Sequence, residues 1–169
     1  MEILAETIAK LAETPRQAEQ LVRGLSEQQL SWKPVPEVFS IRENVLHLRD
    51  IDIEGYARRI RLLLEEQHPS LPDVNGGKLA RERNYNAQPV QLALDDLRLS
   101  RAESVERLRG CSAQDLDRQA EMQGVGTIDL RRLLDLWMQH DAGHIADMAE
   151  LRRAIETGEG PVLLEHQAA

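Results

Sequence analysis

The stretch WMQHDAGHIADM, residues 137–148, lies inside the longest helical pattern of the chain. Thr127 suits an N-cap and Gly158 suits a helix end, so we predict a helix from about Ile128 to Glu156. The same spacing and punctuation predict three more long helices, at about Glu2 to Arg23, Ile41 to Gln67 and Pro89 to Arg109. No segment shows the alternation of a β-strand. The sequence therefore predicts an all-α four-helix bundle.

The length of the chain indicates one domain. A chain of 169 residues can bury a sizeable core without disulfide or metal staples. We place a single domain at residues 1–157 and a loosely held C-terminal tail at 158–169. Residues 68–88, rich in Pro, Asn and Gly, form a long connection between helices two and three, with a possible short helical turn near Lys78 to Arg83.

One helix is expected to be irregular. Thr14 to Gln17 reads as a capping box with Pro15 at the first helical position. A kink or break is therefore expected within the first helix.

Composition excludes several functions. The formal net charge of −8 opposes binding to nucleic acid or to anionic lipid, and no apolar stretch is long enough to cross a bilayer. A single cysteine, Cys111, cannot form an internal disulfide, which fits a reducing compartment, and no neighbouring histidine marks it as a reactive thiol. The N-terminus lacks the pattern of a signal peptide. We expect a cytoplasmic protein.

The fourth helix carries an unusual buried stripe. On a helical wheel, His140, His144 and Asp147 lie in the middle of the apolar face. Buried polar groups are costly unless they are paired or coordinated, and imidazoles four residues apart can reach one cation. Two interpretations stay open from this helix alone, a metal site and a pair of satisfied core histidines.

A motif resemblance offers a third interpretation of the same stretch. HDAGH is similar to the zinc-peptidase pattern H-E-x-x-H, with Asp141 in place of the Glu that acts as general base. Asp141 has a shorter side chain, and no further His or Glu follows in that arrangement. The peptidase interpretation is therefore disfavoured.

The second helix carries a polar strip between two apolar arcs. His47, Asp50 and Glu54 lead this strip, and the wheel places the outer surface at Arg42, Arg49, Asp52 and Arg59. Val45 and Leu63 hint at an exposed apolar strip on the outer side, which is the basis in the residues for a possible homodimer. His47 could supply a third imidazole to His140 and His144. Three protein ligands leave a coordination position open, as in catalytic sites.

Two stretches resemble the DinB-like (YfiT-like) metalloenzyme family. LSEQQLSWKPVPEVFSIRENVLHLRDIDIEGYARRIRLLLEEQHPSLP looks like its W-x-P…S-I-x-E-x-x-x-H-L-x-D-x-E segment, and GVGTIDLRRLLDLWMQHDAGHIADMAELRRAI looks like its T-x-x-x-L-L…H-D-x-x-H segment. Their order and spacing agree, so the resemblance covers about residues 10 to 157. One departure is Asp147, where relatives often carry Gln.

The resemblance implies a four-helix bundle with one divalent metal held by His47, His140 and His144. It implies a small-molecule substrate, common dimerisation and, in some relatives, thiol S-transferase chemistry with a low-molecular-weight thiol such as bacillithiol or mycothiol. Zinc or nickel is the expected metal, although three imidazoles suit several metals. Asp50, Glu54, Asp147 and Asp141 are candidates for the general base or for partners of the ligand imidazoles. The alternatives are a metal-dependent enzyme, thiol S-transferase-like or hydrolase-like, and a non-catalytic metal-binding or stress-associated module.

Overall fold

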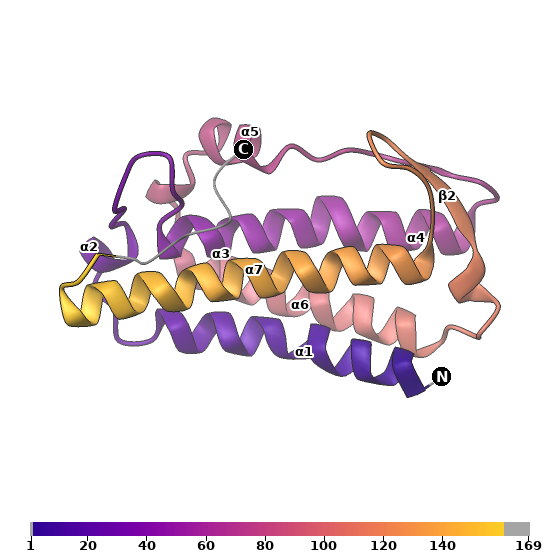
Figure 1. Ribbon diagram of the computed structural model, residues 1–169, viewed down its shortest axis with the longest axis horizontal. Helices are drawn as coiled ribbons and strands as arrows, with labels where there is room; N and C mark the ends of the chain where they lie inside the picture. Colours follow the sequence, from indigo (N-terminus) through magenta and orange to yellow (C-terminus); the bar gives the residue numbers. More distant parts are fainter. Residues whose placement is uncertain (1, 161–169) are drawn as a thin grey trace.

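A computed structural model describes residues 2–160, and within this range four long helical rods form the bundle (Figure 1). The rods are α1 (Glu2–Val22); α3 (Ile41–Asp50) continued by the π-helix η1 (Ile51–Ala57) and α4 (Arg58–Glu65); α6 (Val90–Arg109); and α7 (Leu130–Thr157). The shorter elements are α2 (Glu27–Leu30), β1 (Ser70–Leu71), α5 (Gly76–Glu82), η2 (Tyr85–Ala87), η3 (Asp115–Asp117), β2 (Gln119–Met122) and β3 (Gly126–Asp129). The predicted four-helix bundle is confirmed.

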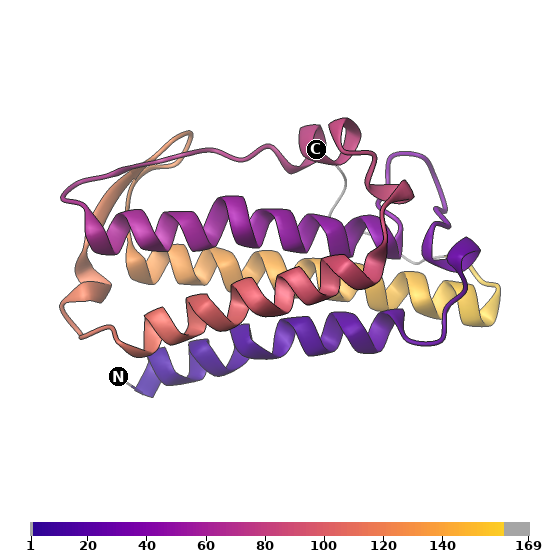
Figure 2. The same cartoon turned by 180° about the vertical axis from the view of Figure 1, so that it is seen from behind.

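The directions of the rods explain the long connection. The second rod and α6 run one way along the bundle, while α1 and α7 run the other way (Figures 1 and 2). Because two consecutive rods are parallel, the chain must return along the length of the bundle between them. Residues 66–89, here called the crossover connection, make this return and place α5 over α3.

The prediction that no strands form was wrong. β2 and β3 make an antiparallel hairpin, and β1 in the crossover connection pairs with β2 in parallel. These strands have two to four residues each, too few for an alternation to stand out. Thr127 and Ile128 belong to β3, so α7 begins at Leu130 with Asp129 as its N-cap.

The expected break at Pro15 does not occur, because α1 runs as one helix from Glu2 to Val22, and the alternative of a kink there stays a prediction. Proline removes one backbone hydrogen bond from a helix interior. Leu11 and Ala18, on either side of Pro15, are buried in the bundle and hold both halves of the helix in place. The predicted tail begins at Gly158, the left-handed residue that caps α7, and lies outside the described residues beyond Gly160.

The π-helix changes which residues of the second rod face inward. Hydrogen bonds from i to i+5 take more residues per turn than those of an α-helix, so the side chains that follow are rotated relative to a regular wheel. Asp52 and Arg59, expected on the outer surface, are 1% and 5% exposed, whereas Ile53, expected on an apolar arc, is 42% exposed. The expectations for Asp52 and Ile53, both within η1, were wrong for this reason. Arg59 is buried because the crossover connection covers it, and its Nε and Nη2 donate to the Pro72 carbonyl oxygen at 3.1 and 2.9 Å.

Four more residues of the second rod that were expected on its outer surface are buried or only partly exposed. Arg42 is buried and donates to the Asn86 carbonyl oxygen at 2.9 Å, and Arg49 is only partly exposed. Val45 and Leu63 are fully buried, so they form no exposed apolar strip. The crossover connection covers this side of α3 and α4, which the wheel of an isolated helix could not show.

The core has two apolar parts. One contains Trp137, Tyr56 and the N-terminal half of α7, and the other contains Phe39, Leu46 and Met148. Residues 140–147 of α7 lie between Trp137 and Met148, at the junction of the two parts. Among the described residues, no helix is both long and apolar enough to cross a membrane.

Candidate functional site

Three histidines from two rods converge at this junction. His47 on α3 and His140 and His144 on α7 each offer a ligand atom, and these atoms all lie within 4.8 Å of one another. The Nε2 atoms of His47 and His140 are 3.0 Å apart. Two nitrogens bound to one tetrahedral zinc ion lie about 3.3 Å apart. The spacing of the imidazoles therefore fits a single metal ion.

Asn44 orients the imidazole of His144. Its Oδ1 lies 2.8 Å from Nδ1 of His144, while its Nδ2 donates to the Ser40 carbonyl oxygen at 3.0 Å. Because the amide nitrogen is engaged by a carbonyl, the amide oxygen faces the ring and accepts from Nδ1–H. This bond selects the tautomer in which Nε2 carries the lone pair, as a metal ligand requires.

Asp141 is the corresponding partner of His140. Its Oδ1 lies 3.4 Å from Nδ1 of His140, and its Oδ2 accepts from the Thr14 hydroxyl and from Arg101 Nη1, both at 2.8 Å. Burial alone would raise the pKa of Asp141, but the charge of Arg101 and the bonds from His140 and Thr14 hold this pKa below its usual value. A carboxylate beside a ligand imidazole is a common arrangement in metal sites.

Arg101 connects this carboxylate to a second one. The guanidinium is buried, donates from Nε to Asp52 at 2.7 Å and lies 4.5 Å above the ring of Trp137. Ser100 also donates to Asp52, at 2.6 Å. Asp52, Arg101 and Asp141 thus form a buried cluster beside the histidines, reaching from η1 through α6 to α7.

Aromatic rings surround the histidines. Tyr56 stacks on Trp137 with centroids 5.0 Å apart and lies 5.7 Å from the His140 ring, while Phe39 lies 5.3 Å from the His47 ring. Burial raises the pKa of Tyr56 to about 12, so its phenol stays protonated at neutral pH. These rings exclude water from the side of the site that faces the core.

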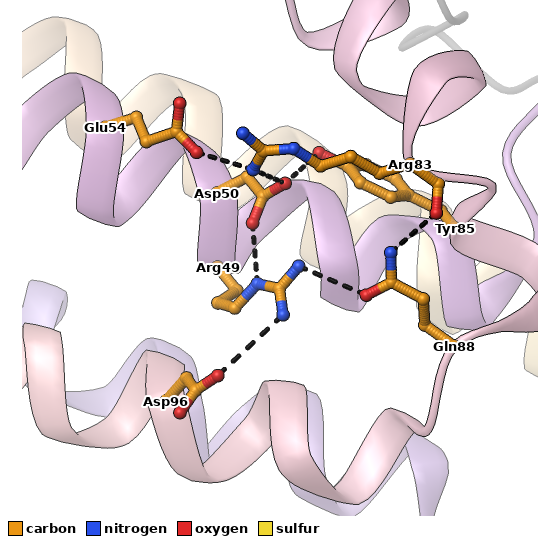
Figure 3. A network of polar contacts seen from close by, with 7 residues as sticks. All are labelled: Arg49, Asp50, Glu54, Arg83, Tyr85, Gln88 and Asp96. Carbon is orange, nitrogen blue, oxygen red and sulfur yellow. Dashed lines mark hydrogen bonds and ion pairs between the residues drawn. The ribbon is translucent and has the colours of Figure 1, made fainter.

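Asp50 and Glu54 face the crossover connection (Figure 3). Asp50 accepts from Arg49 Nε at 2.6 Å, from Arg83 Nη1 at 2.7 Å and from the Tyr85 hydroxyl. Glu54 pairs with the same Arg83. Within the described residues, the polar partners of both carboxylates are these side chains rather than the histidines.

Asp147, the remaining candidate, and Cys111 are both buried. Asp147 lies one turn beyond His144 on α7 and is 5% exposed, but the group of mutually close ligand atoms consists of the three histidines. Cys111 is also buried, its sulfur lies 3.6 Å from the Arg107 carbonyl oxygen, and burial raises its thiol pKa. Cys111 is therefore a poor nucleophile.

Four contributing residues were missed from the sequence: Asn44, Tyr56, Phe39 and Arg101. A wheel of the third helix would have found Arg101, because Leu94, Leu97, Val105 and Leu108 all lie within roughly 40° of it. A regular wheel places Tyr56 opposite His47, so the π-helix hid that residue.

Comparison with known proteins identifies the family and the fold. The model of the DinB superfamily matches residues 10–148. A protein of Oceanobacillus iheyensis named "Putative metal-dependent hydrolase" is 23% identical over 149 residues, covering 88% of this chain and 86% of the relative. A Bacillus pumilus protein with the same name is 27% identical over 154 residues, covering 89% and 85%. The solved structure of YfiT from Bacillus subtilis, described as "a probable metal-dependent hydrolase with an unusual four-helix bundle topology", matches with a TM-score of 0.85 and 24% identity, covering 92% of this chain and 89% of that one.

Proposed function

Because the chain belongs to the DinB superfamily, we propose that its three converging histidines bind one divalent metal ion. His47, His140 and His144 are the ligands, and the single observation that carries this proposal is the mutual proximity of their ligand atoms. Asn44 and Asp141 support it, because each lies at the Nδ1 atom of a ligand imidazole. Zinc and nickel both suit such a set of nitrogen ligands.

The proposed activity is hydrolysis of a small substrate. Three protein ligands leave a coordination position for water or substrate, and a metal there lowers the pKa of bound water or polarises a carbonyl or phosphoryl oxygen. The relatives named as metal-dependent hydrolases support this reaction class. In this proposal, Asn44 and Asp141 orient the ligands, and Asp147, buried on α7 one turn after His144, acts as a general base.

A metal-binding module without catalysis is the second candidate. It is favoured by the burial of Asp147 one turn from His144, because a fourth protein ligand would close the coordination shell. The two candidates differ in whether the metal has a coordination position that an added anion can occupy. With cobalt in the site, an open position gives anion-dependent changes in the visible spectrum, and a closed site gives none.

The thiol S-transferase activity, the homodimer and the cytoplasmic location stay predictions. Turnover of an electrophile with bacillithiol or mycothiol, compared with turnover by water, distinguishes the transferase from the hydrolase. Sedimentation at several protein concentrations measures the oligomeric state.

The proposal is tested by metal analysis of purified protein reconstituted with zinc, nickel or manganese. The wild type and Gln139→Ala, an exposed neighbour on α7, are expected to hold one equivalent. His140→Ala is expected to lose it. Since a metal that binds only the folded state stabilises it, free zinc at 100 times its Kd should add about 2.7 kcal/mol to the free energy of unfolding of the wild type. A wild type that retains no near-stoichiometric metal would refute the proposal.

A further inference from the structure

The crossover connection lies directly on one of the three histidines. A Cβ atom added to Gly76, the first residue of α5, would be 2.2 Å from Cε1 and 2.6 Å from Nδ1 of His47. Real Cβ atoms essentially never come this close to such atoms, so the backbone of Gly76 is in contact with the imidazole ring. The φ of Gly76 is not in the left-handed region. Its glycine is therefore required by the ring rather than by the backbone conformation.

Glycine at this position lowers stability, because alanine would restrict the unfolded chain at a backbone conformation that alanine can adopt. Nothing but His47 lies within 3.4 Å of the added Cβ. Across the ring, Phe39 and His144 lie at centroid distances of 5.3 and 4.4 Å. The His47 imidazole is thus confined between α5 and the bundle.

Asp50 holds α5 in this place. It lies one turn after His47 on α3 and receives hydrogen bonds from Arg83, immediately after α5, and from Tyr85 in η2 (Figure 3). Arg83 also pairs with Glu54. One turn of α3 therefore carries both a histidine of the site and the carboxylate that fixes the segment resting on that histidine.

We infer that Gly76 and Asp50 are positioning residues, which set the orientation of the His47 imidazole through the docking of α5. The inference rests on the proposed function for its meaning, because it makes metal affinity depend on the crossover connection. Neither residue contacts a substrate or a metal in this scheme. Gly76 limits the rotation of the ring, and Asp50 keeps Gly76 against it.

The first experiment measures cobalt binding to Gly76→Ala. Cobalt reports both affinity and ligand geometry through its visible spectrum. We expect at least about a tenfold loss of affinity with an altered spectrum, the size found when partners of metal ligands are removed. The control is Gly55→Ala, a buried glycine in the π-helix η1, where the new Cβ would meet Ile51 Cγ2 at an ordinary 3.5 Å. This control should stay within about twofold of the wild type. An affinity and a spectrum for Gly76→Ala equal to those of the control overturn the inference.

The second experiment is a double-mutant cycle in the metal-free protein. Gly76→Ala should lower the midpoint of urea unfolding in the wild-type background. With His47→Ala the ring is gone, and the same change should raise the midpoint or leave it constant, because alanine restricts the unfolded chain. An equal effect in both backgrounds overturns the inference. This cycle needs no metal, so it gives an answer even if the wild type binds none and the proposed function fails.

The third experiment tests the anchor. Asp50→Asn should lower cobalt affinity about tenfold with the same spectral change as Gly76→Ala. If it does not fold, Arg83→Ala removes the exposed end of the same contact and should shift affinity and spectrum in the same direction by less. Arg81→Ala, on the exposed side of α5, is the control. Unchanged cobalt binding in the folded anchor variant would remove Asp50 from the inference.

Discussion

Two buried carboxylates two residues apart, Asp50 and Asp52, serve opposite sides of one helical rod. Asp52 faces the bundle and pairs with Arg101, where the two side chains are 0% and 2% exposed. Asp50 faces the crossover connection and pairs with Arg83, whose side chain is 37% exposed. The first pair joins long helices to each other, and the second attaches a connecting segment to a helix.

The surroundings of the two ion pairs determine how much each contributes to the free energy of unfolding. Breaking a buried pair leaves an uncompensated charge in the interior, which costs much more than the pair gains when intact. A pair with a solvent-exposed partner is partly replaced by water and contributes little. Changes in the cluster of Asp52, Arg101 and Asp141 should therefore have the larger effect on the free energy of unfolding. Changes in the Asp50 cluster should mainly affect metal binding at the site that it positions.

The largest effect is expected from Arg101→Met. The change leaves Asp52 and Asp141 inside the bundle without their shared cation, so the free energy of unfolding should fall by about 3–5 kcal/mol. Urea unfolding of the metal-free protein at neutral pH measures it. Arg98→Met, exposed on the same helix, should change little. Similar losses in the free energy of unfolding for the two variants would contradict a larger contribution from the buried cluster.

Next comes Asn44→Ala, which removes the partner of His144 rather than a charged group. Metal affinity should fall about 10- to 100-fold, because Nδ1 loses the acceptor that fixes its tautomer. Competition with a zinc chelator measures the Kd. Asn44→Asp keeps an oxygen at that position and should lose much less. If metal affinity falls equally in both variants, the hydrogen bond between His144 and residue 44 does not contribute to metal binding.

Tyr85→Phe examines the Asp50 cluster from its buried side. The ring stays in place and one hydrogen bond to a charged acceptor is lost, so the free energy of unfolding should fall by about 1.5 kcal/mol. Burial, together with the bond to Asp50, raises the pKa of Tyr85. Its stabilisation is therefore complete below about pH 10, where the unfolded phenol begins to ionise, and declines as pH rises further. A difference between wild type and variant that does not shrink above that pH contradicts this account.

The smallest effect is expected from Arg83→Ala. Its guanidinium is partly solvated, so stability should fall by less than about 1 kcal/mol. A loss as large as that of Arg101→Met would remove the contrast between the two clusters. Urea unfolding of both variants under the same conditions makes the comparison direct.

The inward-facing residues could be predicted from the sequence where the helices have regular α-helical geometry. α7 is an α-helix over its whole length, so the wheel placed His140, His144 and Asp147 on the buried side. The second rod is regular as far as Asp50, which is why His47 was also placed inward. Beyond Ile51 the wheel failed, because η1 has a different number of residues per turn.

The contacts between elements could not be predicted in this way. The hydrogen bond between His144 and Asn44 spans 100 positions, and the one that Thr14 donates to Asp141 spans 127. Such pairs depend on which rods are neighbours, and a wheel describes one helix at a time. The contact of Gly76 with His47 depends in addition on the path of the crossover connection.

The number of residues in η1, which is seven, sets how the two halves of the second rod are oriented relative to each other. Upstream of η1 the rod presents His47 to the histidines of α7, and within η1 it presents Tyr56 to Trp137 and His140. Removing any one residue between Ile51 and Ala57 would allow an unbroken α-helix, and the two halves would then turn relative to each other by roughly 100°. Such a deletion would keep every histidine and still turn the Tyr56 ring away from Trp137 and His140. In comparing relatives of this chain, a one-residue gap at this place therefore matters more than several substitutions around it.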